Sequence, residues 1–151
     1  MMTETLECLQ VKLGESPILR AGSVPTSEEI NQASKVLGVP FAADYRAFLL
    51  EFGGAMVGPY PIFGLRPVEV MGDDHWSVID VTRHYRNEAV PGTVEWVVFS
   101  DDHAGNPVGM DANGVVWIHD HDFGGVVMLA PNFEEYLRTR CLNMDTGLSS
   151  T

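Results

Sequence analysis

Two clusters of His and Asp are the residues best suited to chemistry. The first runs His119-Asp120-His121-Asp122, and the second runs Asp101-Asp102-His103. Imidazole and carboxylate groups together bind zinc and similar metals. If the strand expected at His119 continued through the first cluster, His119 and His121 would point to one side and the two aspartates to the other. A composite metal site across neighbouring strands is therefore one candidate.

Both clusters also fit an explanation without metal, because Asp, Asn, Gly and His gather in strand-end turns, where they satisfy backbone groups. Neither cluster has a pattern as specific as a zinc finger or an H-E-x-x-H helix. The chain also lacks a G-x-S-x-G elbow, a Walker-type phosphate loop and a dinucleotide fingerprint. The sequence therefore predicts no cofactor and a protein that is not an enzyme. A metal-dependent enzyme that uses the His119–Asp122 cluster is the least favoured alternative.

The charge of the chain is strongly one-sided. Nine Lys and Arg stand against 21 Asp and Glu, which gives a formal net charge of −12. From Met71 onward, 13 acids face four arginines. Such a field repels nucleic acid and anionic membranes and speeds encounter with cationic partners; solubility alone is the other explanation. We therefore expect a basic protein partner and no binding to nucleic acid or membrane.

The acids in predicted loops are the ones best placed to contact such a partner. Carboxylates form charge-assisted bonds to Arg and Lys, whereas affinity depends on buried aromatic anchors. Tyr60 and Trp76 are the candidate anchors, and we assign Trp96 and Trp117, which lie in predicted strands, to packing. The candidate partner-binding residues are Asp73, Asp74, Trp76, Asp101, Asp102, Asp120 and Asp122.

These residues must be positioned by the elements around them, and the first third of the chain predicts three helices. Leucines at helical spacing indicate a short helix that ends near Gly14. A second helix should begin at Thr26, because Thr26-Ser27-Glu28-Glu29 has the form of a capping box, and end at Gly38. A third should begin at Pro40 and stop at Gly53-Gly54. Its apolar stripe, which we expect to be core, comprises Phe41, Tyr45, Phe48, Leu49 and Phe52.

The rest of the chain predicts a sheet and a closing helix. Short extended pieces are expected at Tyr60–Leu65 and Pro67–Met71, and we favour a helix for the ambiguous stretch 76–86. A tight turn at Asp111–Gly114 should take positive φ angles at Asn113 and Gly114. The closing helix should begin near Asn132, with Glu134 and Arg138 paired on its surface. The main strands are expected at Val94–Ser100, Pro107–Met110, Val115–His119, which should be central, and Val126–Ala130.

This order of elements predicts an α+β fold, with N-terminal helices packed on an antiparallel meander sheet of about four to six strands and closed by a C-terminal helix. A length of 151 residues fits one domain, 1–151, with its core at about 24–142 and a frayed tail at 143–151. The chain start lacks the features of a secretion signal, and no apolar run has the length needed to cross a bilayer. Cys8 and Cys141 make no disulfide framework. We therefore expect a cytoplasmic protein.

A series of short motifs spans the chain from about Val24 to Leu142. They are Pro25–Ile30, Leu37–Pro40, Tyr45–Leu49, Gly53-Gly54, Val97–Phe99, Gly105-Asn106, Met110-Asp111, Gly114–Trp117, His121 and Leu129–Leu137. Most are turn glycines and core residues, so that their order and spacing carry the specificity. In this order they resemble the SUKH superfamily, which includes yeast cell-wall-synthesis regulators and many bacterial toxin-immunity proteins.

The resemblance implies a fold, whereas members differ in partner, so that function needs its own argument. We expect an immunity protein that binds and neutralises a cognate bacterial toxin, with nucleases among the candidates, through an acidic surface. The alternative is a general protein-interaction or scaffold module of the cell-wall-regulator type. The identity of the toxin and the oligomeric state are left open by the sequence.

Overall fold

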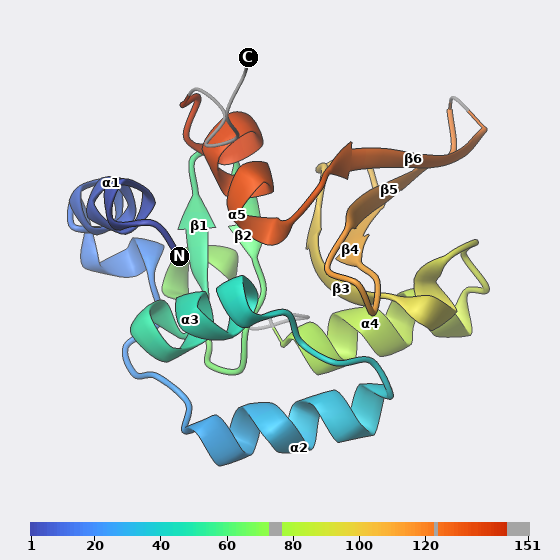
Figure 1. Ribbon diagram of the computed structural model, residues 1–151, viewed down its shortest axis with the longest axis horizontal. Coiled ribbons are helices and arrows are strands. Elements are labelled where there is room, and N and C mark those ends of the chain that lie inside the picture. Colours follow the sequence, from blue (N-terminus) through green and yellow to red (C-terminus); the bar gives the residue numbers. More distant parts are fainter. Residues whose placement is uncertain (73–76, 123, 145–151) are drawn as a thin grey trace.

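Helices precede most of the strands, and a further helical segment follows the last strand (Figure 1). The computed structural model describes residues 1–72, 77–122 and 124–144. The α-helices are α1 (Thr3–Leu13), α2 (Ser27–Leu37), α3 (Ala43–Phe52), α4 (Val78–Asn87) and α5 (Phe133–Tyr136). Short 3-10 helices are η1 (Pro17–Leu19), η2 (Glu69–Met71) and η3 (Thr93–Glu95), and η4 (Leu137–Cys141) is a π-helix. The strands are β1 (Ala55–Val57), β2 (Tyr60–Ile62), β3 (Val97–Asp101), β4 (Pro107–Met110), β5 (Val116–Asp120) and β6 (Gly125–Ala130).

Local capping signals define the helices that were predicted correctly. The Thr26 side chain accepts a hydrogen bond from the Glu29 N–H, and the Glu29 side chain accepts one from the Thr26 N–H, so that the capping box of α2 is confirmed. Gly38 then ends α2 with a left-handed φ of 73°. The helix that ends near Gly14 and the helix favoured within 76–86 are confirmed by α1 and α4.

The third helix begins later than predicted. Pro40 lies outside α3, whose N-cap is Ala42 with an extended backbone. This extended segment lets Phe41 enter the core, where its ring centroid lies 5.3 Å from that of Tyr45. The packing of Phe41 therefore overrides the tendency of Pro40 to start a helix.

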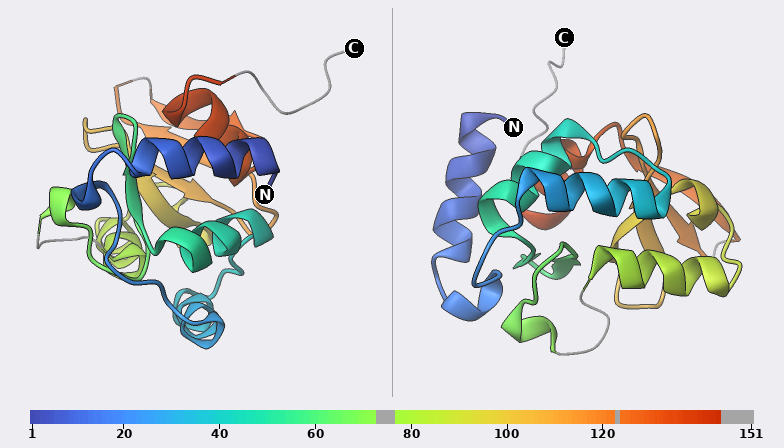
Figure 2. Two further views of the ribbon diagram at one scale, coloured as in Figure 1. Left: turned by 90° about the vertical axis from the view of Figure 1, so that its left-hand side faces the viewer. Right: turned by 90° about the horizontal axis from the view of Figure 1, so that it is seen from below.

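Within the described residues, the six strands form two sheets. β1 and β2 make an antiparallel pair, and β3, β4, β5 and β6 follow one another as an antiparallel meander. α4 lies beneath the meander against β3, and α1 lies beside β1 at the opposite end of the molecule from the tip of the β5–β6 hairpin (Figures 1 and 2). The predicted α+β class is confirmed, with the first two strands in a sheet of their own.

Two local predictions in the strand regions are wrong. The extended piece expected at Pro67–Met71 contains the helix η2 instead, because the Met71 N–H donates to the Val68 carbonyl in a tight turn. The positive φ angles expected at both Asn113 and Gly114 occur only at Gly114, whose φ is 82°. The Asp111 carboxylate holds this turn by accepting hydrogen bonds from the N–H groups of Asn113 and Val115, which is the usual work of Asp in turns.

The core lies between α3, β3 and α5, where six aromatic rings gather. Four edge-to-face pairs have ring centroids 5.1 to 5.5 Å apart, and each pair adds about 0.5–1.5 kcal/mol beyond its burial. The predicted burial of Phe48, Leu49 and Phe52 is confirmed, since none of them is exposed. The six rings are those of Tyr45, Phe48, Phe52, Phe99, Phe133 and Tyr136.

The helical segment after β6 is tied to α1 by a buried arginine. Arg138 is 3% exposed, and its guanidinium donates to the Thr5 hydroxyl at 2.9 Å and lies 3.5 Å from a Glu4 carboxylate oxygen. The prediction that Arg138 lies on the helix surface is therefore wrong, because the face that carries it packs against the N-terminal helix.

The same segment changes from α to π geometry after Tyr136. The Leu142 N–H donates to the carbonyl of Leu137, five residues earlier, at 2.9 Å. This wider turn leaves Cys141 buried while Arg140 is exposed. None of the helices among the described residues is both long and apolar enough to cross a membrane.

Candidate functional site

The topology of the meander brings the two His–Asp clusters to one end of the sheet. Because the strands alternate in direction, the loop between β3 and β4 and the loop between β5 and β6 lie at the same end, and the β4–β5 turn lies at the other. Asp101–His103 stands in the first loop region and Asp120–Asp122 in the second. The two clusters therefore lie at the same end of the sheet, although β4 separates β3 from β5 and the two strands are not neighbours.

Asn106 joins the two loops. It is 2% exposed, and its side-chain N–H donates to Asp102 Oδ2 at 2.8 Å. Its side-chain oxygen accepts a hydrogen bond from the His121 N–H at 3.1 Å and also contacts His121 Nδ1. Sequence reasoning missed this role, because an asparagine in a loop gives no signal that it bridges to another loop.

Asp102 supports the first loop. Its carboxylate accepts hydrogen bonds from the N–H groups of Ala104 and Asn106 as well as from the Asn106 side chain. Partial burial favours a higher pKa for Asp102, but these hydrogen bonds outweigh it and hold the pKa below the ordinary value of 3.8. Asp102 therefore stays a carboxylate at neutral pH.

The remaining acids of this end differ in exposure. Asp101 accepts a hydrogen bond from the His103 N–H, and Asp120 accepts one from the Asp122 N–H. The Asp122 side chain is 70% exposed, and one of its oxygens lies 3.4 Å from His121 Nε2. Asp122 is therefore the predicted contact acid most open to a partner in this loop.

The structure does not support the predicted geometry of a metal site. β5 ends at Asp120, so that His121 lies in the turn and does not share a strand face with His119. The two ring nitrogens of His121 face Asn106 and Asp122. In the part of the chain that the structure describes, no three His, Cys, Asp or Glu side chains gather closely enough to hold a metal ion.

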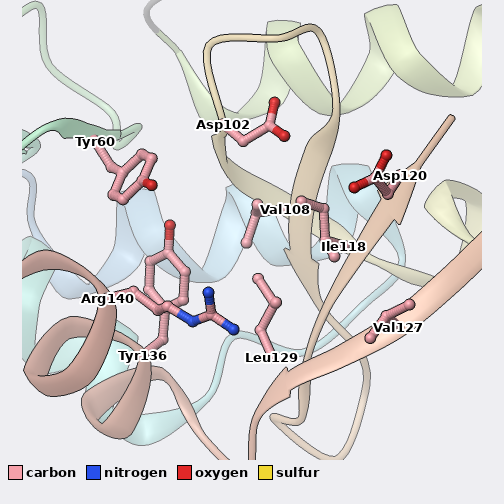
Figure 3. Close-up of a pocket in the computed structure, with 9 residues that line it drawn as sticks. All are labelled: Tyr60, Asp102, Val108, Ile118, Asp120, Val127, Leu129, Tyr136 and Arg140. Carbon is pink, nitrogen blue, oxygen red and sulfur yellow. The ribbon is translucent and has the colours of Figure 1, made fainter. Parts of the chain in front are cut away.

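A hollow of about 360 Å³ lies beside these loops, on one face of the meander (Figure 3). Its floor is apolar and comes from β4, β5, β6 and α5, and Tyr60 forms part of the wall. Arg140 reaches from η4 toward Leu129, while Asp102 and Asp120 stand on the opposite side (Figure 3). The apolar floor consists of Val108, Ile118, Val127, Leu129 and Tyr136.

The strand β6 carries exposed apolar side chains on both of its faces. Val126, Val127 and Met128 are 42%, 51% and 52% exposed, respectively. The strands β5 and β6 were predicted, and β5 does lie between two neighbours, but only Val116 of β5 is buried. This exposure could not be predicted, because an apolar strand has the same pattern whether or not another element covers it.

The aromatic residues considered as partner anchors differ in where they lie. Tyr60 is half-buried, lines the hollow and stacks on the ring of His103 with centroids 5.7 Å apart. Trp96 is buried, and the indole N–H of the half-buried Trp117 donates to Asp111, so that both serve packing as expected. The three other predicted contact residues, Asp73, Asp74 and Trp76, lie outside the described residues.

This end of the molecule combines apolar and acidic groups. An apolar floor with carboxylates on one side fits a side chain that has an aliphatic stem and a cationic head. The nearest thiol, Cys141, is buried, and burial raises its pKa to about 12, which leaves it protonated and a poor nucleophile at neutral pH.

Comparison with known proteins gives one family. The model of the SMI1 / KNR4 family (SUKH-1) matches residues 25–139, which is most of the chain and includes α2 through most of η4. A search of curated proteins found no match.

Proposed function

The chain belongs to the SMI1 / KNR4 family (SUKH-1), and from this membership we propose that it is an immunity protein, which binds a cognate bacterial toxin and neutralises it. The family is broadly associated with toxin immunity and with cell-wall regulation. The observation that supports immunity here is the convergence of two acidic loops and an apolar hollow at one end of the sheet.

Charge explains how such a protein would find its partner. A net charge of −12 accelerates encounter with a basic protein. Toxins that are nucleases carry basic faces for nucleic acid, and the carboxylates of Asp120 and Asp122 can take the place of phosphates there. We therefore place the basic face of the toxin against the hairpin loops of this end.

The hollow can provide the buried contacts that charge alone does not provide. Charges at the rim of an interface mainly set the rate of association, whereas buried contacts set how long the complex lasts. A lysine or arginine of the toxin would lie with its stem over Ile118 and Leu129 and its head near Asp120. Arg140, on the other side of the hollow, would then favour an acidic or carbonyl group of the toxin next to that lysine or arginine.

We propose that the protein inhibits by binding, without catalysis and without a cofactor, in the cytoplasm of a bacterium. Support for a reducing compartment comes from Cys8 and Cys141, which are both free thiols in the structure.

Co-expression with the product of the neighbouring gene tests the proposal. Rescue of growth, followed by co-purification and a complex that weakens between low and physiological salt, is the expected result. Absence of both toxicity and binding would leave an interaction module of the cell-wall-regulator type instead.

Charge reversal then locates the interface. Asp122→Lys should weaken the complex roughly tenfold, mainly through slower association. The matched control is Glu7→Lys, an exposed acid on α1 at the other end of the molecule, which should leave the affinity unchanged. Equal effects of the two variants would mean that only net charge matters and that this end is not the contact surface.

A further inference from the structure

The two edges of the four-stranded sheet are treated differently. The outer side of β3 is occupied, because the Phe63 N–H donates to the Phe99 carbonyl at 2.8 Å and the Ser100 hydroxyl donates to the Pro61 carbonyl at 2.5 Å. The outer side of β6 has no hydrogen-bonded neighbour among the described residues. Every second residue of β6 therefore turns its N–H and carbonyl to this outer side, where the described residues supply no hydrogen-bond partner.

The exposed part of this open edge lacks the features that usually block one. Exposed edges commonly carry lysine, proline or a bulge that prevents another strand from pairing. β6 is Gly-Val-Val-Met-Leu-Ala, without a charged residue. Its pairing with β5 is regular over Gly125–Met128, and the register shift lies beyond Met128. The exposed part of β6 is thus a regular, uncharged template for a further strand.

We propose that an extended segment of the partner protein pairs with the free edge of β6 as a fifth strand and carries a basic residue near Asp120 and Asp122. This inference rests on the proposed function for the identity of the partner. Main-chain hydrogen bonds would provide affinity, and alternate side chains would provide specificity.

The two faces of β6 define the pattern of the partner segment. Val127 and Leu129 line the hollow, so that one alternate set of partner side chains lies beside it. The other set lies beside Val126 and Met128, which are both exposed. Apolar residues in the segment and a lysine or arginine at the end near Asp122 would match this surface.

A second copy of this chain fits the edge less well. Each copy carries a net charge of −12, so that association of two copies sets two strongly negative molecules side by side, which self-repulsion opposes. A basic segment gains from the same field. Charge therefore decides for a basic partner over a symmetric dimer.

A synthetic peptide tests the inference without the toxin. The probe has alternating valine and threonine with an arginine at each end, and its counterpart has glutamate at each end. The arginine peptide should bind and slow hydrogen exchange at alternate β6 amides, as followed by NMR, and the glutamate peptide should not. Binding without alternate protection of β6 overturns the inference, as does absence of binding.

Substitution on β6 gives a second readout. Met128→Lys should lower the affinity for the arginine peptide at least about tenfold, whereas Val11→Lys, at an exposed valine of α1, should not change it; thermal unfolding shows that both variants fold. If the protein rescues growth but its β6 amides are not protected from hydrogen exchange in the complex, strand pairing is refuted and the immunity role remains. Pairing of β6 without rescue would refute the immunity role and keep the strand site.

Discussion

Removal of the Asn106 side chain should loosen both hairpin loops at once. Asn106→Ala deletes the donor to Asp102, a bond within the β3–β4 loop, and the acceptor of the His121 N–H, which is the bond that joins this loop to the β5–β6 loop. Because Asn106 is 2% exposed, water cannot replace these partners unless the loops separate. The variant should therefore lose stability and also widen the acidic end of the sheet.

The size of the effect follows from the two bonds. A hydrogen bond to a charged group contributes about 1.5–3 kcal/mol, and a neutral one about 1 kcal/mol. Asn106→Ala should thus lower the free energy of unfolding by about 2–4 kcal/mol. If the proposed basic partner binds at Asp120 and Asp122, its affinity for the variant should fall as well.

Asn106→Asp tests the geometry more sharply. It places a second carboxylate oxygen where an N–H now lies 2.8 Å from Asp102 Oδ2. Two carboxylates so close raise the pKa of one of them. The variant should be the least stable at pH 7 and should regain stability as the pH falls toward 5, because protonation of the pair restores a donor.

Urea unfolding followed by circular dichroism measures these differences. The control is Asn113→Ala in the exposed β4–β5 turn, which should change the free energy of unfolding by less than about 0.5 kcal/mol. If Asn106→Ala were as stable as this control, the hydrogen bonds of Asn106 would not hold the two loops together.

Three further predictions concern the core, acid stability and the thiols. Phe48→Ala should lower the free energy of unfolding by about 3–5 kcal/mol, because the ring is fully buried; a near-neutral result in urea unfolding would contradict the packing of α3. The stability that Asp102 contributes should be complete above its ordinary pKa of 3.8 and should be lost as the pH falls below that value, since folding lowers the pKa of Asp102. The free energy of unfolding of Asp102→Ala, measured against pH, should therefore fall less steeply at acid pH than that of the original protein. The same steepness in both proteins would contradict the role of Asp102. A thiol reagent at pH 8 should label Cys8, which is partly exposed, well before the buried Cys141, and equal rates by mass spectrometry would mean that the last turn opens readily.

Short-range signals were the ones that predicted the fold well. The capping box at Thr26 and Glu29 and the glycines that end α1, α2 and α3 act within one turn of the chain, so that they are visible in the sequence. The start of α3 was wrong because it depends on where Phe41 packs. The exposure of β6 likewise depends on which elements fail to cover it, which no local pattern records.

The candidate site was predicted in part for the same reason. Acids in strand-end loops are recognisable from the sequence, and the meander brings Asp101, Asp102, Asp120 and Asp122 to one end. The roles of Asn106 and Arg140 could not be predicted. Asn106 bonds to a residue of another loop, and the direction of the Arg140 side chain depends on the π turn that carries it. That these acids contact a partner stays a prediction.

The π turn at Leu137–Cys141 has a consequence for how relatives of this protein can diverge. A π turn holds one residue more than an α turn, so that loss of a single codon there would restore regular helix. Side chains beyond the deletion would then rotate by about 100° relative to those before it. Phe133 and Tyr136 would keep their places in the core while another residue replaced Arg140 above the hollow. One codon at this position can therefore change the charge beside the hollow without changing the aromatic core.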